Sequence, residues 1–112
     1  MPFSDKGVLI VDLNGQIAFA NTFFCDLVGV EHSNIRGMSW FDFVFSDDLE
    51  AAKKLFETNK GSSAEPFSFR LKRSDETPIW ADVQGVAMRT ASGEVYAVSA
   101  TVTKSKAKTL GR

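Results

Sequence analysis

The chain has 112 residues, of which 44% are hydrophobic and 10 are phenylalanine, so we expect one domain with a substantial core. A single cysteine, Cys25, excludes an internal disulfide and favours a reducing, cytoplasmic compartment. The net charge of −1 and the absence of a long apolar run argue against a nucleic-acid-binding surface and against membrane insertion.

A β-hairpin is predicted at the start of the chain. Val8–Val11 is a short apolar run rich in β-branched residues, and it is followed by Asp12-Leu13-Asn14-Gly15. Asn-Gly is a strong hairpin signal because both residues tolerate a positive φ. A returning strand is therefore expected at 16–20.

Three short helical segments are expected next. Asn21 can cap the first with its side-chain carbonyl, and Gly29 suits the left-handed residue at a helix end. The second is expected at 33–36, and Ser39 opens the third. Because such short pieces are not stable in isolation, packing must hold them.

The longest helix is predicted to begin at Ser46 and to end at Gly61. Ser46 is its expected N-cap, and Asp47 and Asp48 place negative charge at its positive end. The apolar stripe of this helix consists of Leu49, Ala52 and Phe56.

The remainder is predicted to be antiparallel sheet. Its strands are expected at 65–72, 79–88 and 94–103. Two strands, a helical middle and three strands predict an α+β fold, in which helices cover one face of a five-stranded antiparallel sheet. The domain is expected at 1–103. Residues 104–112 carry four basic residues and no acid, which predicts a basic tail or a truncated connector.

From Gly7 to Thr103 these elements resemble the PAS family of sensory, signal-input domains. The first hairpin up to Ile17 is similar to the family's opening, and Asn21 falls at its helix-capping asparagine. Other matching segments are Leu27-Val28-Gly29, Phe43-Val44-Phe45-Ser46-Asp47-Asp48, Phe69-Arg70-Leu71-Lys72, Trp80 and Gly93-Glu94-Val95. Two positions depart from the family: Glu76 replaces a turn glycine, and Lys104-Ser105-Lys106 replaces the common closing Asp-Ile-Thr.

The resemblance implies no flavin or haem. Flavin-binding members carry an Asn-Cys-Arg motif where this chain has Met38–Phe43, and their ring-binding amides fall at Leu71, Ala81 and Val102. Haem-binding members use a histidine on the long helix, which has none here, and His32 is expected in a surface loop. We therefore expect no cofactor and no metal.

No catalytic residues are predicted. Asp47 and Asp48 are adjacent on a helix, so their carboxylates do not face each other, and the chain has no Gly-rich phosphate loop. The domain is expected to be a non-enzymatic input part of a bacterial histidine kinase (two-component system), a cyclic-dinucleotide enzyme or a transcription regulator.

The inner face of the sheet is predicted to be wholly apolar, with small residues at its centre. Large side chains from the helices would cover it. The candidate pocket residues are Trp40, Phe43, Phe56, Phe69, Leu71, Ala81, Val83, Ala100 and Val102. Two interpretations stay open: the aromatic rings fill the space in a packed core, which we favour, or an apolar pocket remains. Neither accommodates a charged metabolite.

The opposite face is predicted to expose an apolar patch, which usually marks a partner surface. The candidate interface residues are Trp80, Val86, Met88 and Tyr96. We expect a cytoplasmic sensor that responds to a signal or an apolar small molecule. It would pass this signal through the sheet face to a second copy or to another PAS or output domain. The alternative is a ligand-free dimerisation or docking module.

Overall fold

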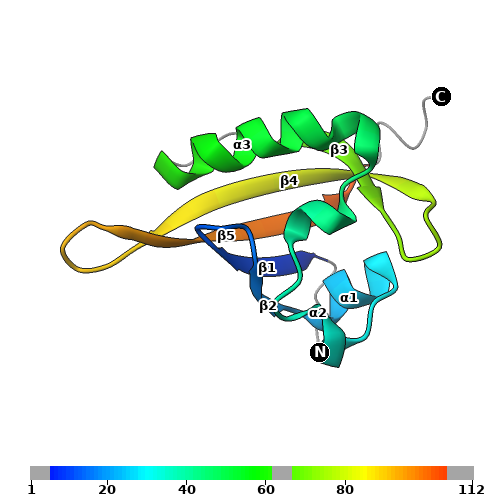
Figure 1. Cartoon of the computed structure of the whole chain (residues 1–112), viewed down its shortest axis with the longest axis horizontal. Helices are drawn as coiled ribbons and strands as arrows, with labels where there is room; N and C mark the ends of the chain where they lie inside the picture. Colours follow the sequence, from blue (N-terminus) through cyan, green and yellow to red (C-terminus); the bar gives the residue numbers. More distant parts are fainter. Residues whose placement is uncertain (1–5, 62–66, 106–112) are drawn as a thin grey trace.

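The computed structural model describes residues 6–61 and 67–105, without the side chains of 58–61. Five strands form one antiparallel sheet in the order β2-β1-β5-β4-β3, so the first hairpin lies beside the last strand (Figure 1). The strands are β1 (Gly7–Asp12), β2 (Ile17–Ala20), β3 (Phe67–Lys72), β4 (Pro78–Arg89) and β5 (Val95–Lys104). The predicted α+β fold class is confirmed.

The helical segments lie between β2 and β3 in the chain, as predicted. They are α1 (Thr22–Val28), α2 (His32–Ile35), the 3₁₀ turns η1 (Trp40–Phe43) and η2 (Ser46–Asp48), and α3 (Leu49–Gly61). Asn21 caps α1, since its side-chain oxygen accepts a hydrogen bond from the Phe24 amide at 3.1 Å. In Figure 1, α3 runs along β4, and α1 and α2 lie beside the first hairpin.

The start of the long helix differs from the prediction. Ser46 is not an N-cap but the first residue of the 3₁₀ turn η2, and the α-helix begins only at Leu49. Phe45 precedes this turn, and its amide donates to the Arg70 carbonyl at 3.0 Å. Pairing with β3 therefore positions the start of the helical segment.

The hairpin turn positions η1. Gly15 has φ 87°, and a Cβ atom there would lie 3.2 Å from the Phe41 ring. The Gly15 carbonyl accepts a hydrogen bond from the Trp40 amide at 2.9 Å. Ser39 then caps η1 as predicted, accepting from the Phe41 amide at 3.2 Å. A residue without a side chain is required here, because η1 packs directly on the turn.

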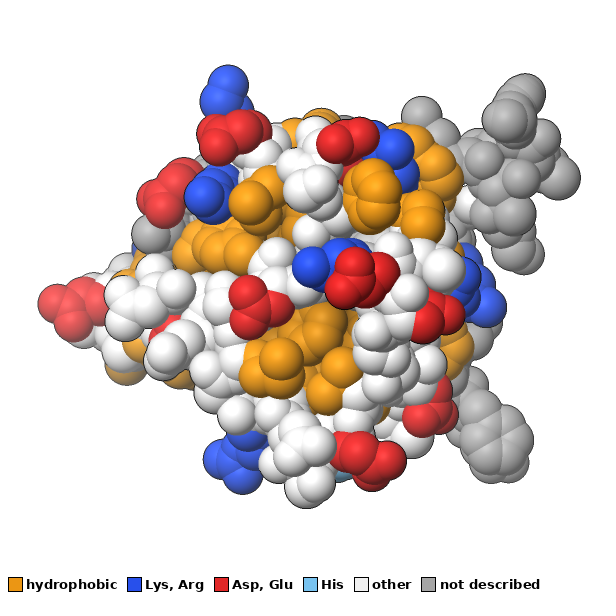
Figure 2. Space-filling model, turned by 45° about the vertical axis from the view of Figure 1, so that its right-hand side comes forward, with side chains coloured by type: hydrophobic (Ala, Val, Ile, Leu, Met, Phe, Trp, Pro, Cys, Tyr) orange, Lys and Arg blue, Asp and Glu red, His pale blue; other side chains and the backbone are white. Residues whose placement is uncertain are grey.

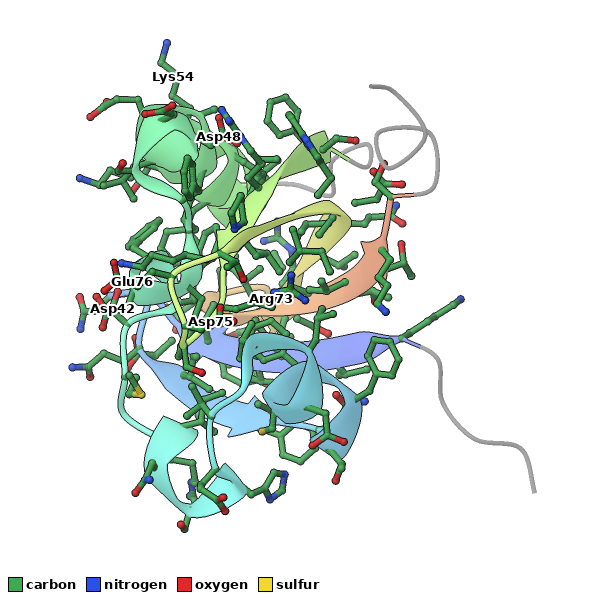
Figure 3. All side chains as sticks on the ribbon, turned by 90° about the vertical axis from the view of Figure 1, so that its right-hand side faces the viewer. Asp42, Asp48, Lys54, Arg73, Asp75 and Glu76 are labelled. Atoms are coloured by element: carbon green, nitrogen blue, oxygen red, sulfur yellow. The ribbon has the colours of Figure 1, made fainter. Side chains whose placement is uncertain are left out.

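The turn between β3 and β4 keeps the backbone that a glycine usually supplies. Glu76 stands at this position with φ 70°, a left-handed conformation. The Ser74 amide donates to the Val28 carbonyl at 2.8 Å, so the turn, which Figure 3 shows around Asp75 and Glu76, bonds to the end of α1.

One apolar core lies between the helices and the inner face of the sheet. Alternation along the strands holds as predicted, since Phe69, Leu71, Ala81, Val83 and Val102 are all buried. Among the described residues, no helix is both long enough and apolar enough to cross a bilayer.

Candidate functional site

A cavity of about 30 Å³ lies inside the core, between the helical layer and the inner face of the sheet. This volume is close to what one water molecule needs. The lining side chains are all apolar, and only that of Trp40 carries a polar group, the indole N–H. The wall is formed by Leu9, Val11, Phe24, Trp40, Phe43, Leu55, Phe56, Leu71, Val83, Val98, Ala100 and Val102.

The structure brings most of the predicted pocket residues to this wall. Phe69 and Ala81 do not line it; they are packed in the surrounding core with 1% and 0% exposure. Five lining residues were missed, two of them on β1, where Leu9 pairs with Ala100 and Val11 pairs with Val98. Alternation along Val8–Val11 could have indicated an inward face, but not that β1 lies next to β5.

Aromatic rings close the cavity on the helical side. The Trp40 ring lies 4.6 Å from the Phe41 ring and 6.0 Å from the rings of both Phe56 and Phe69, centroid to centroid. The side chain of Trp40 is 8% exposed, and its indole N–H is buried without a hydrogen-bond partner. Burial of an unpaired donor typically costs about 1–3 kcal/mol.

The outer face carries a row of side chains that crosses four strands and is apolar except for Ser99 on β5. Phe19 pairs with Ile10, Ile10 with Ser99, and Ser99 with Val86, so these side chains share one face. Phe19 and Val86 are 44% and 45% exposed. The contribution of the first hairpin to this surface was missed, because it depends on the position of β1 in the sheet.

The four predicted interface residues are not brought together as one patch. Met88 is half-buried and lies near Val86 on β4, whereas Trp80 lies roughly 20 Å away along the same strand at about 3.3 Å per residue. Tyr96 is 51% exposed and sits at an irregularity in β5, where Ala97 pairs with Met88 but Val95 pairs with Arg89. Tyr96 is the extra residue of this bulge.

A cluster around Arg70 links the helical side to the outer face. The Asp48 carboxylate accepts from Arg70 Nε at 3.0 Å, from Nη2 at 2.9 Å and from the Arg70 amide at 2.7 Å. Figure 3 shows Asp48 at the side of α3, next to β3. The side-chain bond from Arg70 is the main cause that lowers the pKa of Asp48. The carboxylate is therefore charged at neutral pH, and Arg70 is firmly held.

The guanidinium of Arg70 also contacts two aromatic rings. Its central carbon lies 5.0 Å from the centre of the Phe45 ring and 5.1 Å from that of Trp80. The Trp80 carbonyl accepts from the Ser105 amide at 3.1 Å, at the end of the last strand. The cluster of Phe45, Asp48, Arg70 and Trp80, called the Arg70 cluster below, thus extends from the start of α3 to the point where β5 ends. Sequence analysis missed it.

The two other residues considered for chemistry, His32 and Cys25, make structural contacts. His32 Nε2 lies 2.8 Å from the Ala20 carbonyl, at the start of α2. Cys25 is buried, and burial raises the pKa of its thiol. Within 6–61 and 67–105, no group of three or more His, Cys, Asp or Glu residues is arranged to hold a metal ion.

Figure 2 shows one face of the molecule, on which apolar side chains of the described residues reach the surface in separate patches. Charged side chains, other polar side chains and backbone lie between these patches.

Comparisons with known proteins agree with this architecture. A PAS domain from Colwellia psychrerythraea superposes with a TM-score of 0.83 at 13% identity, over 93% of this chain and 89% of that one. The PAS domain of an HTR-like protein from Haloarcula marismortui gives 0.74 at 18% identity, over 91% and 83%. The Drosophila melanogaster Cycle PAS-B domain with bound ethylene glycol gives 0.76 at 14%, over 88% and 99%.

The sequence comparisons differ in what they find. No curated protein matches the chain significantly. The family model of the PAS domain matches residues 5–103, which is nearly the whole chain and includes every described strand and helix except the last residue of β5. The chain therefore belongs to the PAS domain family of sensory and signalling modules.

Proposed function

We propose that this PAS domain receives its signal in the cavity and passes it to a partner through the outer face of the sheet. The observation that carries the proposal is the wall of the cavity, which consists of side chains from both layers. Entry of a small apolar molecule would therefore act on α3 and on the centre of the sheet together. The Drosophila Cycle neighbour, solved with ethylene glycol, supports the idea that this fold admits small neutral molecules.

The Arg70 cluster is the proposed link between the two faces. Asp48 lies directly before α3, which contributes Leu55 and Phe56 to the wall. A shift of α3 would pull on the Asp48 carboxylate, then on the guanidinium of Arg70, and so on the ring of Trp80. Ser105, bonded to the Trp80 carbonyl, would carry the same change to the end of β5.

The proposed partner is a second copy of the chain or another PAS or output domain. The row formed by Phe19, Ile10 and Val86 would be the centre of the contact, with Trp80 towards its margin. The parent protein is proposed to be a cytoplasmic histidine kinase, cyclic-dinucleotide enzyme or transcription regulator.

We further propose that no flavin or haem is bound to this domain. Purified protein should therefore show no visible absorption band, and a stoichiometric flavin spectrum would contradict this.

A second candidate function is a ligand-free docking module. It is favoured by the small cavity volume of about 30 Å³, which leaves the core nearly filled. Native mass spectrometry distinguishes the two functions, because a retained apolar molecule supports the sensor and is incompatible with a module that never binds one.

The same substitution at two alanines tests whether the cavity offers usable space. Ala100 lines the cavity. Ala81 is 0% exposed and does not line the cavity. Ala81→Val should overpack the core and cost about 1–3 kcal/mol. Ala100→Val should change the free energy of unfolding by less than about 0.5 kcal/mol or increase it, because the added carbons fill empty space. Denaturant midpoints at equal m-values measure both effects, and equal losses would refute a usable cavity.

A further inference from the structure

Among the described residues, Trp40 is the one member of the cavity wall whose side chain carries a polar group, its indole N–H. This N–H is buried and has no hydrogen-bond partner. The Trp40 amide is bonded to Gly15, and three phenylalanine rings surround the indole. A donor held in one position without an acceptor is a feature that a ligand can satisfy.

Neither water nor the surrounding rings satisfy this donor well. The volume of about 30 Å³ would admit one water molecule, but a buried water needs two to four polar partners, and this wall offers only one side-chain donor. The face of an aromatic ring is a weak acceptor. The suitable acceptor is therefore an oxygen or nitrogen atom that arrives on an otherwise apolar molecule.

We propose that the ligand of this cavity is a small, neutral molecule with one hydrogen-bond acceptor, such as a ketone or ether oxygen, which binds Trp40 Nε1. This inference rests on the proposed sensory function and names the ligand class. Charged molecules are excluded, because no charged side chain lines the cavity. Any molecule larger than water must enlarge the space, and Leu55 on α3 is a half-buried member of the wall.

A pair of probes that differ in the acceptor tests the proposal. Cyclopentanone and cyclopentane have similar rings, but only the ketone has an oxygen atom. The full chain contains two tryptophans, so its ¹H–¹⁵N spectrum has two indole peaks, and a Trp80→Phe variant assigns the peak of Trp40. Cyclopentanone should move the Trp40 indole proton downfield in a saturable manner, with a dissociation constant on the order of millimolar. Cyclopentane should not.

Trp40→Phe is the matched variant, since it keeps an aromatic ring and removes the donor. The unmodified chain should prefer cyclopentanone over cyclopentane by about tenfold, and Trp40→Phe should lower this preference to about one. Both probes could shift the NMR peaks of the lining methyl groups equally, with no downfield shift of the Trp40 indole proton. In that case the inference that the ligand carries a hydrogen-bond acceptor for Trp40 is wrong, while the proposed sensory function stands. If neither probe shifts any lining residue, ligand sensing fails as well. The spectra of the unmodified chain decide both outcomes even if Trp40→Phe does not fold.

Discussion

The inner and outer faces of the sheet are associated with one tryptophan each, and the two indole rings are held in opposite ways. Trp40 is 8% exposed and lies among phenylalanine rings, with its N–H unpaired. Trp80 is half-buried, and its ring lies under the guanidinium of Arg70. Close packing against phenylalanine rings holds the Trp40 ring in the core. The Trp80 ring on the outer face is held instead by its contact with the charged side chain of Arg70. This contact is the basis of the proposal that a change in the core reaches Trp80 through the side chain of Arg70.

The largest expected effect is a difference in stability between a substitution on the inner face of the sheet and one on the outer face. Phe69 is 1% exposed in the core, so Phe69→Ala should lower the free energy of unfolding by about 3–5 kcal/mol. Val86→Ala, on the outer face and 45% exposed, should stay within about 0.5 kcal/mol of the unmodified protein. Urea titrations of both variants measure the difference. Comparable losses would show that the outer face is part of a packed core.

A smaller effect is expected at the contact that joins the two sides. Asp48→Asn should cost about 1–2 kcal/mol, because it weakens three charge-assisted bonds to a partly exposed arginine. Asp47→Asn is the matched control: its carboxylate is 69% exposed and lies 4.0 Å from Arg70, so a change below about 0.5 kcal/mol is expected. Thermal or urea unfolding near neutral pH compares the two, and equal effects would contradict a special role for Asp48.

The pH dependence of this difference follows from the lowered pKa of Asp48. A depressed pKa in the folded state means that the stabilisation is fully present above the unfolded value, about 3.9 for an aspartate, and is lost as the pH falls through the folded value. The gap in stability between the unmodified protein and Asp48→Asn should therefore be constant above about pH 5 and should shrink below about pH 4. If the stability difference between the two proteins widened on acidification, the pKa of Asp48 would not be lowered in the folded state.

The fold was predictable from local signals, whereas the contact between the two sides was not. Alternation placed Phe69 and Ala81 on one face, and the Asn21 cap follows from local hydrogen bonding. The bond between Asp48 and Arg70 joins positions 22 residues apart, and each charge alone is typical of a solvated surface. Sequence periodicity carries no information about which strands are neighbours, so the role of β1 in the cavity wall was also missed.

The smallest effect concerns association through the outer face. Val86→Asp should weaken self-association about tenfold, because it places an unpaired carboxylate in the proposed contact. Trp80→Ala should weaken it less, since its ring is already half covered by Arg70. Sedimentation velocity over a concentration series measures both. A larger effect of Trp80→Ala would move the centre of the contact to Trp80, and a chain that stays monomeric throughout would contradict the proposed homodimer.

The central claim is that packing around the cavity is transmitted to the outer face through Arg70, and the indole peak of Trp80 tests it most directly. Ala100→Val fills the cavity far from this ring, so it should shift the Trp80 indole peak in the ¹H–¹⁵N spectrum. The same substitution combined with Arg70→Gln should leave the peak where Arg70→Gln alone places it, as expected for coupled sites in a double-mutant cycle. An unchanged Trp80 peak in Ala100→Val, or a shift that persists without Arg70, would contradict the account.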